Sequence, residues 1–266
     1  MVYIILAVIA AFAVYAVIEN RLILRVRRED LGGNIKAVHL SDLHKRRFGK
    51  DNSRLCKAVE RESPDIIIFS GDLVSRTETK FSAIKRTLDS LCGIAPVYII
   101  IGNHEESLPP EMQEEFLKCV SETDTVLLRN ETVRTEIKGR NIAICGLHDN
   151  YEVYKKDGGY RGLEKITTDS ITSQLGKRPD GEVLLMAHNP FFGEAYAEWG
   201  ADWVFSGHVH GGIVRIFGKA MLSPERKFFP KNAKGVYSFG RTRLLVSAGL
   251  GKLRLFNAPE IVVYMM

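Results

Sequence analysis

The chain opens with a long apolar run, and its later apolar segments are short and separated by polar or amphipathic stretches. From residue 35 onwards, short β-branched and aromatic runs alternate with segments whose apolar residues recur every three or four positions. The first pattern is typical of buried strands and the second of amphipathic helices. The expected strands are 35–40, 65–69 and 96–101, and the expected helices are 51–62, 81–91 and 110–119.

The pattern changes after residue 130. Segments 132–137 and 141–145 flank Lys138-Gly139-Arg140, which predicts a hairpin. Later strands are expected at 183–186, 203–205, 213–217, 235–239, 243–246 and 261–264. Parallel β-α-β units followed by mostly antiparallel strands predict an α/β fold, a four-layer α/β/β/α sandwich of two mixed sheets flanked by helices.

Residues 2–18 are apolar without exception. Seventeen residues at a rise of ~1.5 Å each span roughly 25 Å, near the lower limit for crossing a bilayer. No basic side chain precedes the run, and Glu19, Asn20 and Arg21 follow it in place of the small residues of a cleavage site. We therefore predict an uncleaved N-terminal transmembrane helix; a buried core helix is the alternative.

The charges that follow the apolar run predict its orientation. Arg21, Arg25, Arg27 and Arg28 lie on the side of the folded domain. The positive-inside tendency then places that domain in the cytoplasm of a single-pass protein of the cell membrane, with an exported, tethered domain as the alternative. The expected division is an anchor over 1–20, a basic linker over 21–34 and one folded domain over 35–266.

Composition is that of an ordinary globular domain, with 26% charged and 45% apolar residues. No C-x-x-C pair occurs among the cysteines, so neither a disulfide framework nor a zinc knuckle is predicted; they are Cys56, Cys92, Cys119 and Cys145. The net charge of +5 is uneven, because residues 215–254 carry ten Lys/Arg and one acid. Such a region attracts phosphate, anionic lipid or nucleic acid, although a merely solvated surface explains it equally well.

Polar side chains of metal-binding type follow five of the expected strands directly. They are Asp42 and His44, then Asp72, then Asn103 with His104, then His188, and last His208 with His210. Open α/β sheets place their sites at the carboxyl ends of strands. One such motif means little, because a histidine at a strand end is usually structural. Five in this order are hard to explain by structure alone.

The residue types suit a particular chemistry. Carboxylates, imidazoles and one amide oxygen are ligands for Mn²⁺, Fe²⁺ or Zn²⁺. A carboxylate between two ions can bridge them at ~3.5–4 Å, as two-metal hydrolases require. The set has no thiolate, which argues against a structural zinc site.

The motifs SDLH, GD, GNHE, HNP and GHVHGG resemble those of the calcineurin-like metallophosphoesterases. WGADWVFSGHVHGG, VSAGLG and RLFNAPEI are similar to the membrane-associated bacterial branch of that family. The resemblance extends from about residue 35 to the C-terminus, which makes 35–266 a metallophosphoesterase domain.

The resemblance implies a site with two divalent ions of the Mn, Fe or Zn type. One ion would be held by Asp42, His44 and His210, the other by Asn103, His188 and His208, and Asp72 would bridge them. His104 would be the catalytic residue that faces the substrate, stabilising the transition state or protonating the leaving oxygen. The nucleophile would be a metal-bridging hydroxide that attacks phosphorus in line.

Several neighbouring residues have two interpretations each. Glu105 either hydrogen-bonds His104 or lies on the surface. Lys45-Arg46-Arg47 stands where many relatives carry glycine, and a basic rim that binds a second phosphate is one interpretation of it. The segment 221–230 has adjacent phenylalanines beside basic residues and either touches lipid or forms a packed loop.

Five further residues are expected to be structural or to lie at the edge of the site. His39 lies inside a strand and is expected to be core packing. Trp199 and Trp203 are expected to pack rather than to bind substrate. His148 and Asp149 follow a strand and either line the cleft or lie outside it.

We expect a membrane-anchored phosphoesterase that hydrolyses a phosphate ester or pyrophosphate bond in a phosphorylated, membrane-proximal or lipid-linked substrate. The alternative is a non-catalytic scaffold of the same fold that binds a protein partner. The complete ligand set and His104 argue against it, because a scaffold needs neither. A nuclease is disfavoured because the chain has no recognisable nucleic-acid module. The sequence does not indicate the native substrate, the metal or the oligomeric state.

Overall fold

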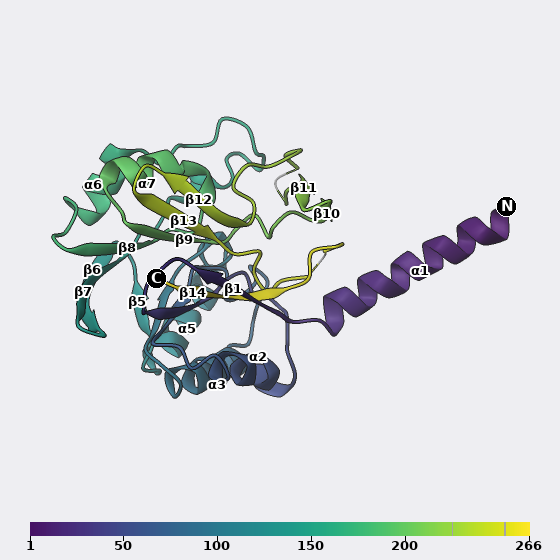
Figure 1. Cartoon of the computed structure of the whole chain (residues 1–266), viewed down its shortest axis with the longest axis horizontal. Helices are drawn as coiled ribbons and strands as arrows, with labels where there is room; N and C mark the ends of the chain where they lie inside the picture. Colours follow the sequence, from purple (N-terminus) through teal and green to yellow (C-terminus); the bar gives the residue numbers. More distant parts are fainter. Residues whose placement is uncertain (225, 253) are drawn as a thin grey trace.

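The computed structural model describes residues 1–224, 226–252 and 254–266, and its centre is a pair of sheets packed face to face. Helices cover both outer faces, which gives four layers (Figure 1). The expected α/β/β/α sandwich of two mixed sheets is therefore confirmed.

The first sheet has the strand order β1-β14-β2-β3-β4-β5. Its strands are β1 (Arg25–Asp30), β2 (Lys36–Leu40), β3 (Ile66–Phe69), β4 (Val97–Ile100), β5 (Val126–Leu128) and β14 (Glu260–Met265). β2 to β5 are parallel, whereas β14 runs antiparallel to β2. Every residue of β3 and β4 is buried, as a sheet covered on both faces requires.

The second sheet has the order β12-β13-β9-β8-β7-β6. Its strands are β6 (Glu131–Ile137), β7 (Arg140–Gly146), β8 (Glu182–Met186), β9 (Trp203–Ser206), β12 (Gly235–Phe239) and β13 (Thr242–Val246). β6 and β7 form the predicted hairpin. The expectation of mostly antiparallel strands is wrong here, because β7, β8, β9 and β13 run parallel to one another.

Helices explain that difference. α6 connects β7 to β8 and α7 connects β8 to β9, so the second sheet also contains β-α-β units. The helices are α1 (Val2–Arg21), α2 (Ser53–Glu60), α3 (Ser82–Cys92), α4 (Asn103–Glu106), α5 (Pro110–Ser121), α6 (Thr168–Leu175) and α7 (Gly193–Trp199). The 3₁₀ turns are Lys50–Asn52, Tyr151–Val153 and Pro190–Phe192, and two short strands, β10 (Val214–Ile216) and β11 (Lys219–Leu222), form a separate ribbon.

Alternating side chains of β3 divide the core into layers. Ile66 and Ile68 point into the space between the sheets. Ile67 and Phe69 point to the other face, where α2, α3 and α5 pack. A third cluster joins the second sheet to α6 and α7. The loops at the carboxyl ends of the parallel strands are thereby held by rigid elements on both sides.

The N-terminal segment differs from expectation in one part. Residues 25–30, predicted as part of a linker, form β1, which pairs with β14 along its whole length. The charged sequence RVRRED hid this strand, but an edge strand tolerates charge because one side remains exposed. Arg27 pairs with the buried Glu260, and Arg28 pairs with Glu62.

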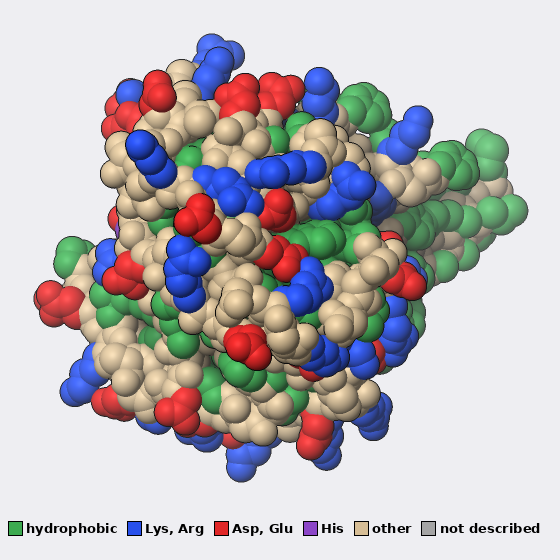
Figure 2. Space-filling view, turned by 60° about the vertical axis from the view of Figure 1, so that its left-hand side comes forward, with side chains coloured by type: hydrophobic (Ala, Val, Ile, Leu, Met, Phe, Trp, Pro, Cys, Tyr) green, Lys and Arg blue, Asp and Glu red, His purple; other side chains and the backbone are tan. Residues whose placement is uncertain are grey.

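α1 projects away from the folded body (Figure 1), and its apolar side chains extend beyond the body in Figure 2. Within the described residues it is the one helix long and apolar enough to cross a membrane, judged by length and composition. Its most apolar stretch has a mean hydropathy of 2.5, and 6% of that stretch is buried. A signal sequence has the same properties, so the anchor remains a prediction.

His39 is a core residue, as expected. It is fully buried in β2, and its Nε2 lies 2.7 Å from Ser70 Oγ. Burial, reinforced by the charge of Arg27, lowers the pKa of His39 to about 3. In the unfolded chain His39 binds a proton near pH 6.5, whereas in the folded chain it stays neutral down to about pH 3. The free energy of unfolding therefore decreases as the pH falls through that range.

Replacing His39 with glutamine will make stability less dependent on pH. When the pH falls from 7 to 5, His39 lowers the free energy of unfolding of the wild type by about 2 kcal/mol. Glutamine makes no such contribution because it does not titrate. Urea unfolding at both pH values measures the difference, and the other histidines cancel because both proteins share them. Parallel losses of stability in the two proteins would contradict this prediction.

Candidate metal centre

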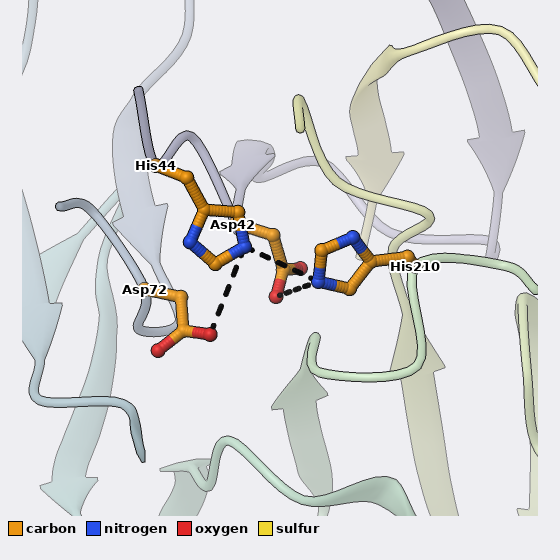
Figure 3. A group of neighbouring side chains, drawn as sticks. All are labelled: Asp42, His44, Asp72 and His210. Atoms are coloured by element: carbon orange, nitrogen blue, oxygen red, sulfur yellow. Dashed lines mark hydrogen bonds and ion pairs between the residues drawn. The ribbon is translucent and has the colours of Figure 1, made fainter. Parts of the chain in front are cut away.

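The loops that follow β2, β3 and β9 bring four candidate ligands together (Figure 3). One ligand atom from each of Asp42, His44, Asp72 and His210 lies within 4.8 Å of the others. His44 Nε2 is 3.2 Å from His210 Nε2 and 3.8 Å from Asp72 Oδ2, and His210 Nε2 is 3.5 Å from Asp42 Oδ1. Coordinating nitrogens and oxygens therefore converge on one point from three different strands.

The remaining candidates form an adjoining group. His188 Nε2 lies 3.4 Å from Asp72 Oδ2, and His208 Nδ1 lies 3.0 Å from Asn103 Oδ1. The rings of His188 and His208 are 5.2 Å apart. Asp72 thus contacts both groups, and all seven predicted ligands lie in one place.

The backbone at these positions is unusual. Asp42, His44, Asp72, His208 and His210 all have φ between 51° and 67°. Residues other than glycine rarely adopt this left-handed conformation, because Cβ then crowds the following carbonyl. Such strain clusters at functional sites, where the surrounding structure holds it. Five of the seven candidate ligands are held in this way.

The loop between β13 and β14 closes over Asp42. Gly249 in that loop has φ +71°, and a Cβ there would lie 2.5 Å from Asp42 Oδ2. Only glycine fits so close to a carboxylate oxygen. The segment VSAGLG therefore contributes space around the centre rather than a ligand.

The charges of the centre fit divalent cations. Burial alone would raise the pKa of Asp72, but His188 and His104 hold it well below its usual range. The two carboxylates in turn raise the pKa of His188 to about 10, against the effect of its burial. Asp42 Oδ2 and His188 Nε2 are buried without a hydrogen-bond partner. Two buried carboxylates need positive charge beside them; the raised pKa of His188 supplies part of it, and metal ions would supply it with His188 neutral and free to coordinate.

His104 lies beside this centre rather than in it. Its backbone N–H donates to Asp72 Oδ1 at 2.8 Å, and burial lowers the pKa of its imidazole to about 4. Arg76 N–H donates to His104 Nδ1 at 3.3 Å, and the Arg76 guanidinium Nη2 is 3.0 Å from His104 Nε2. A guanidinium can only donate, so Nε2 must accept if its contact with Arg76 is a hydrogen bond, and a neutral imidazole cannot accept at both ring nitrogens.

Neither interpretation of Glu105 is correct. It is 1% exposed and bonds no atom of His104. Instead Oε2 accepts hydrogen bonds from Asp72 N at 3.0 Å and Gly102 N at 2.8 Å, and Oε1 accepts one from Val74 N at 2.7 Å. Glu105 therefore ties the loop after β3 to the loop after β4, which sets the position of Asp72.

Replacing Glu105 with glutamine will destabilise the protein. The amide NH₂ cannot accept, so at least one buried backbone N–H loses its partner, at a cost of about 2 kcal/mol. This corresponds to a fall of roughly 4–8 °C in Tm for a chain of this size. The matched control is Glu106→Gln at the next position, where the half-buried side chain bonds His148. Equal decreases in Tm in the two variants would show that Glu105 does not have this role.

A cavity of about 60 Å³ opens at the metal centre. Besides five of the predicted residues, it is lined by Arg76, Tyr151, Tyr154, Lys155, Tyr160 and Pro224. Sequence reasoning missed these. The sequence could have indicated Arg76 only by its position, as a basic residue in the same loop as Asp72. The tyrosines come from an irregular segment whose sequence has no recognisable pattern.

The other residues singled out in the sequence lie around this cavity or away from it. Trp199 and Trp203 pack as expected, and their indole N–H groups donate to Gly176 O and to Glu182 Oε1. Asp149 is buried and accepts a hydrogen bond of 2.6 Å from Tyr154, so it supports the cavity wall without lining it. His148 pairs with Glu106 at 2.8 Å.

The basic triplet after His44 does not form a rim around the cavity. Arg46 is 3% exposed and stacks on Phe48 at 4.7 Å, and Arg47 lies 3.7 Å from Glu78. None of the three residues lines the cavity of the metal centre. The expected second phosphate site on this rim is therefore not supported at that place.

Comparisons with known proteins agree with the site. The family model for calcineurin-like phosphoesterases matches residues 35–212. Phosphodiesterase YaeI of Escherichia coli is 25% identical over 248 residues, which cover 88% of this chain and 83% of YaeI. UDP-2,3-diacylglucosamine pyrophosphatase LpxG of Chlamydia muridarum is 23% identical, covering 86% of this chain and 82% of LpxG.

A solved structure supports the fold. The phosphopantetheinyl hydrolase PptH of Mycobacterium tuberculosis superposes with a TM-score of 0.52 at 14% identity, over 84% of this chain and 92% of PptH. The chain belongs to the calcineurin-like phosphoesterase family. With its His/Asp metal site of the kind typical of binuclear members, it is a metal-dependent phosphoesterase, a hydrolase.

Proposed function

We propose that this enzyme hydrolyses a phosphate ester or pyrophosphate bond in a lipid-linked substrate at the membrane to which α1 anchors it. One observation carries the proposal: the seven candidate ligands lie together beside a cavity that four of them line together with His104 and Arg76. A scaffold would have no reason to retain strained ligand loops at this cost.

The proposed ligand sets follow the two groups of side chains. Asp42, His44 and His210 would hold one ion, Asn103, His188 and His208 would hold the second, and Asp72, which contacts both groups, would be shared by the two ions. When bound, the ions lower the pKa of water to generate a nucleophile and neutralise charge on the phosphoryl oxygens.

His104 and Arg76 act on the substrate. His104 lines the cavity and, once Arg76 has turned away from Nε2, carries its ring proton on that nitrogen and donates to the leaving oxygen, which stabilises the charge that develops there. The Arg76 guanidinium, now 3.0 Å from that nitrogen, turns to the phosphoryl oxygens, for which its planar fork is suited. Both roles need side chains that are held beside the metal centre without binding metal.

The small cavity takes little more than the phosphate, so the rest of the substrate lies outside it. Tyr151, Tyr154 and Tyr160 line the cavity and give it an aromatic part. Pro224, which also lines it, belongs to the segment that carries Phe228 and Phe229, which are 76% and 64% exposed. Exposed phenylalanines among lysines and arginines are typical of a surface that touches lipid.

The relative LpxG supports a lipid-linked substrate by its name, since UDP-2,3-diacylglucosamine carries two acyl chains and a pyrophosphate. We further propose membership of the membrane-associated branch, with the domain on the cytoplasmic side, because arginines follow α1 on the domain side. Protease added to intact cells tests this placement, and cleavage of the domain from outside would refute it.

The proposal is tested with the full-length protein in a neutral detergent. Metal is removed and Mn²⁺ restored, and hydrolysis is measured on a phosphomonoester, a phosphodiester and a pyrophosphate, each with and without a diacyl tail. We expect metal-dependent hydrolysis, with a higher kcat/KM for the tailed member of at least one pair. Equal values within all three pairs would overturn the lipid-linked substrate, and no hydrolysis at all would overturn the catalytic role.

A further inference from the structure

The end of α1 is fixed to the loop before β14. The Asn20 amide donates to Arg254 O at 2.6 Å, and Arg254 N–H donates back to Asn20 Oδ1 at 3.0 Å. The rings of Tyr15 and Phe256 are 5.2 Å apart, and Arg54 Nη2 donates to Leu22 O at 2.8 Å. The last turns of α1 therefore have a defined position on the folded domain.

The same loop contacts the metal centre. Leu250 N–H donates to Ser41 O at 2.9 Å, next to Asp42. The Arg254 guanidinium donates through Nη1 to His210 O at 3.2 Å and through Nε to Gly251 O at 3.0 Å. Arg254 thus lies between the end of α1 and one of the candidate metal ligands.

A cavity of about 460 Å³ lies at this junction, separate from the cavity of the metal centre. The apolar part of its lining consists of Ala16, Val17, Ile213 and Leu255. The polar part consists of Asn20, Arg21, Lys252 and Arg254. None of these described lining residues is acidic. The cavity therefore offers three cations beside an apolar wall that continues along α1.

Buried arginines at this junction have unused donors. Arg254 is 3% exposed and its Nη2 has no hydrogen-bond partner. Arg46, also 3% exposed, has no partner for either Nη. Guanidinium N–H groups that are buried without an acceptor favour an anion that can accept their hydrogen bonds.

We propose that this cavity binds the phosphate headgroup of an anionic membrane lipid, with Arg21, Lys252 and Arg254 on the phosphate and an acyl chain along α1. The inference rests on the proposed anchoring of α1, which brings the cavity to the level of lipid headgroups. The apolar half of the lining favours a lipid over free phosphate, because free phosphate gains nothing from Val17 and Leu255.

Direct binding to the metal-free, full-length protein in neutral detergent tests the proposal. The probes are short-chain dihexanoyl phosphatidylglycerol, dihexanoyl phosphatidylcholine and inorganic phosphate, titrated calorimetrically. The variant is Arg21→Glu with Lys252→Glu, which reverses two lining charges. The matched control is Lys57→Glu with Lys118→Glu, two exposed lysines on α2 and α5 that make the same change in net charge.

We expect phosphatidylglycerol to bind at least tenfold more tightly than phosphatidylcholine or phosphate, and the lining variant to weaken it about thirtyfold or more. The control should bind as the wild type does. Equal binding of the two lipids, equal weakening by the control, or phosphate binding as tight as that of phosphatidylglycerol would each overturn the lipid site. Because no hydrolysis is measured, such a result would leave the proposed enzymatic function standing.

Discussion

Replacing Asp72 with asparagine will lower kcat/KM by about 10³-fold, or about 4 kcal/mol of transition-state stabilisation. Asp72 Oδ2 lies 3.8 Å from His44 Nε2 and 3.4 Å from His188 Nε2, so this carboxylate contacts both groups of candidate ligands. Asparagine keeps the size of the side chain but removes the negative charge that a bridging ligand needs. Initial rates with Mn²⁺ on the preferred member of the substrate panel measure the loss.

The control for this variant is Asp89→Asn, an exposed carboxylate on α3 that pairs with Lys85. Its kcat/KM should equal that of the wild type. If Asp72→Asn retained wild-type activity, a bridging role for Asp72 would be untenable, and so would the division of the ligands into two sets.

Replacing His104 with glutamine will lower kcat by about 10²- to 10⁴-fold, the range of a positioned proton donor. The reason is the place of the imidazole: it lines the cavity of the metal centre, and its ring does not join the four-residue ligand cluster. The metal content of the variant should therefore remain that of the wild type. This separates His104 from the ligands, whose loss would lower metal content and rate together.

His148→Gln serves as the matched control, because His148 pairs with Glu106 and does not line the cavity. Its kcat should change little. Full activity in His104→Gln, or metal loss equal to the rate loss, would refute a role for His104 on the substrate.

The sequence predicts most of what a strong local pattern can encode. β3 and β4 are continuous runs of buried isoleucine, valine and aromatic residues, and their identity as core strands required no tertiary information. The ligands follow from the same logic, since Asp42, Asp72 and His188 each come directly after such a strand. Parallel strands deliver their carboxyl ends to one edge, so ligands distant in sequence become neighbours in space.

Features that depend on pairing could not be predicted. β1 is a charged edge strand whose pattern is that of a linker, and only its pairing with β14 defines it. Glu105 is adjacent to His104 in sequence, yet the start of α4 turns its carboxylate to the backbone of another loop. Arg46 follows the first motif but is buried away from the metal cavity. In each case a contact between distant segments decides the role of the residue.

Locating and counting the bound metal ions is the most direct test of the two-metal centre. Crystals of the full-length protein loaded with Mn²⁺, measured at the manganese absorption edge, would give anomalous peaks at the ions themselves. We predict two peaks ~3.5–4 Å apart on either side of Asp72. One should lie among Asp42, His44 and His210 and the other among Asn103, His188 and His208. A single peak, or peaks away from these side chains in a protein that hydrolyses its substrate, would contradict the two-metal centre.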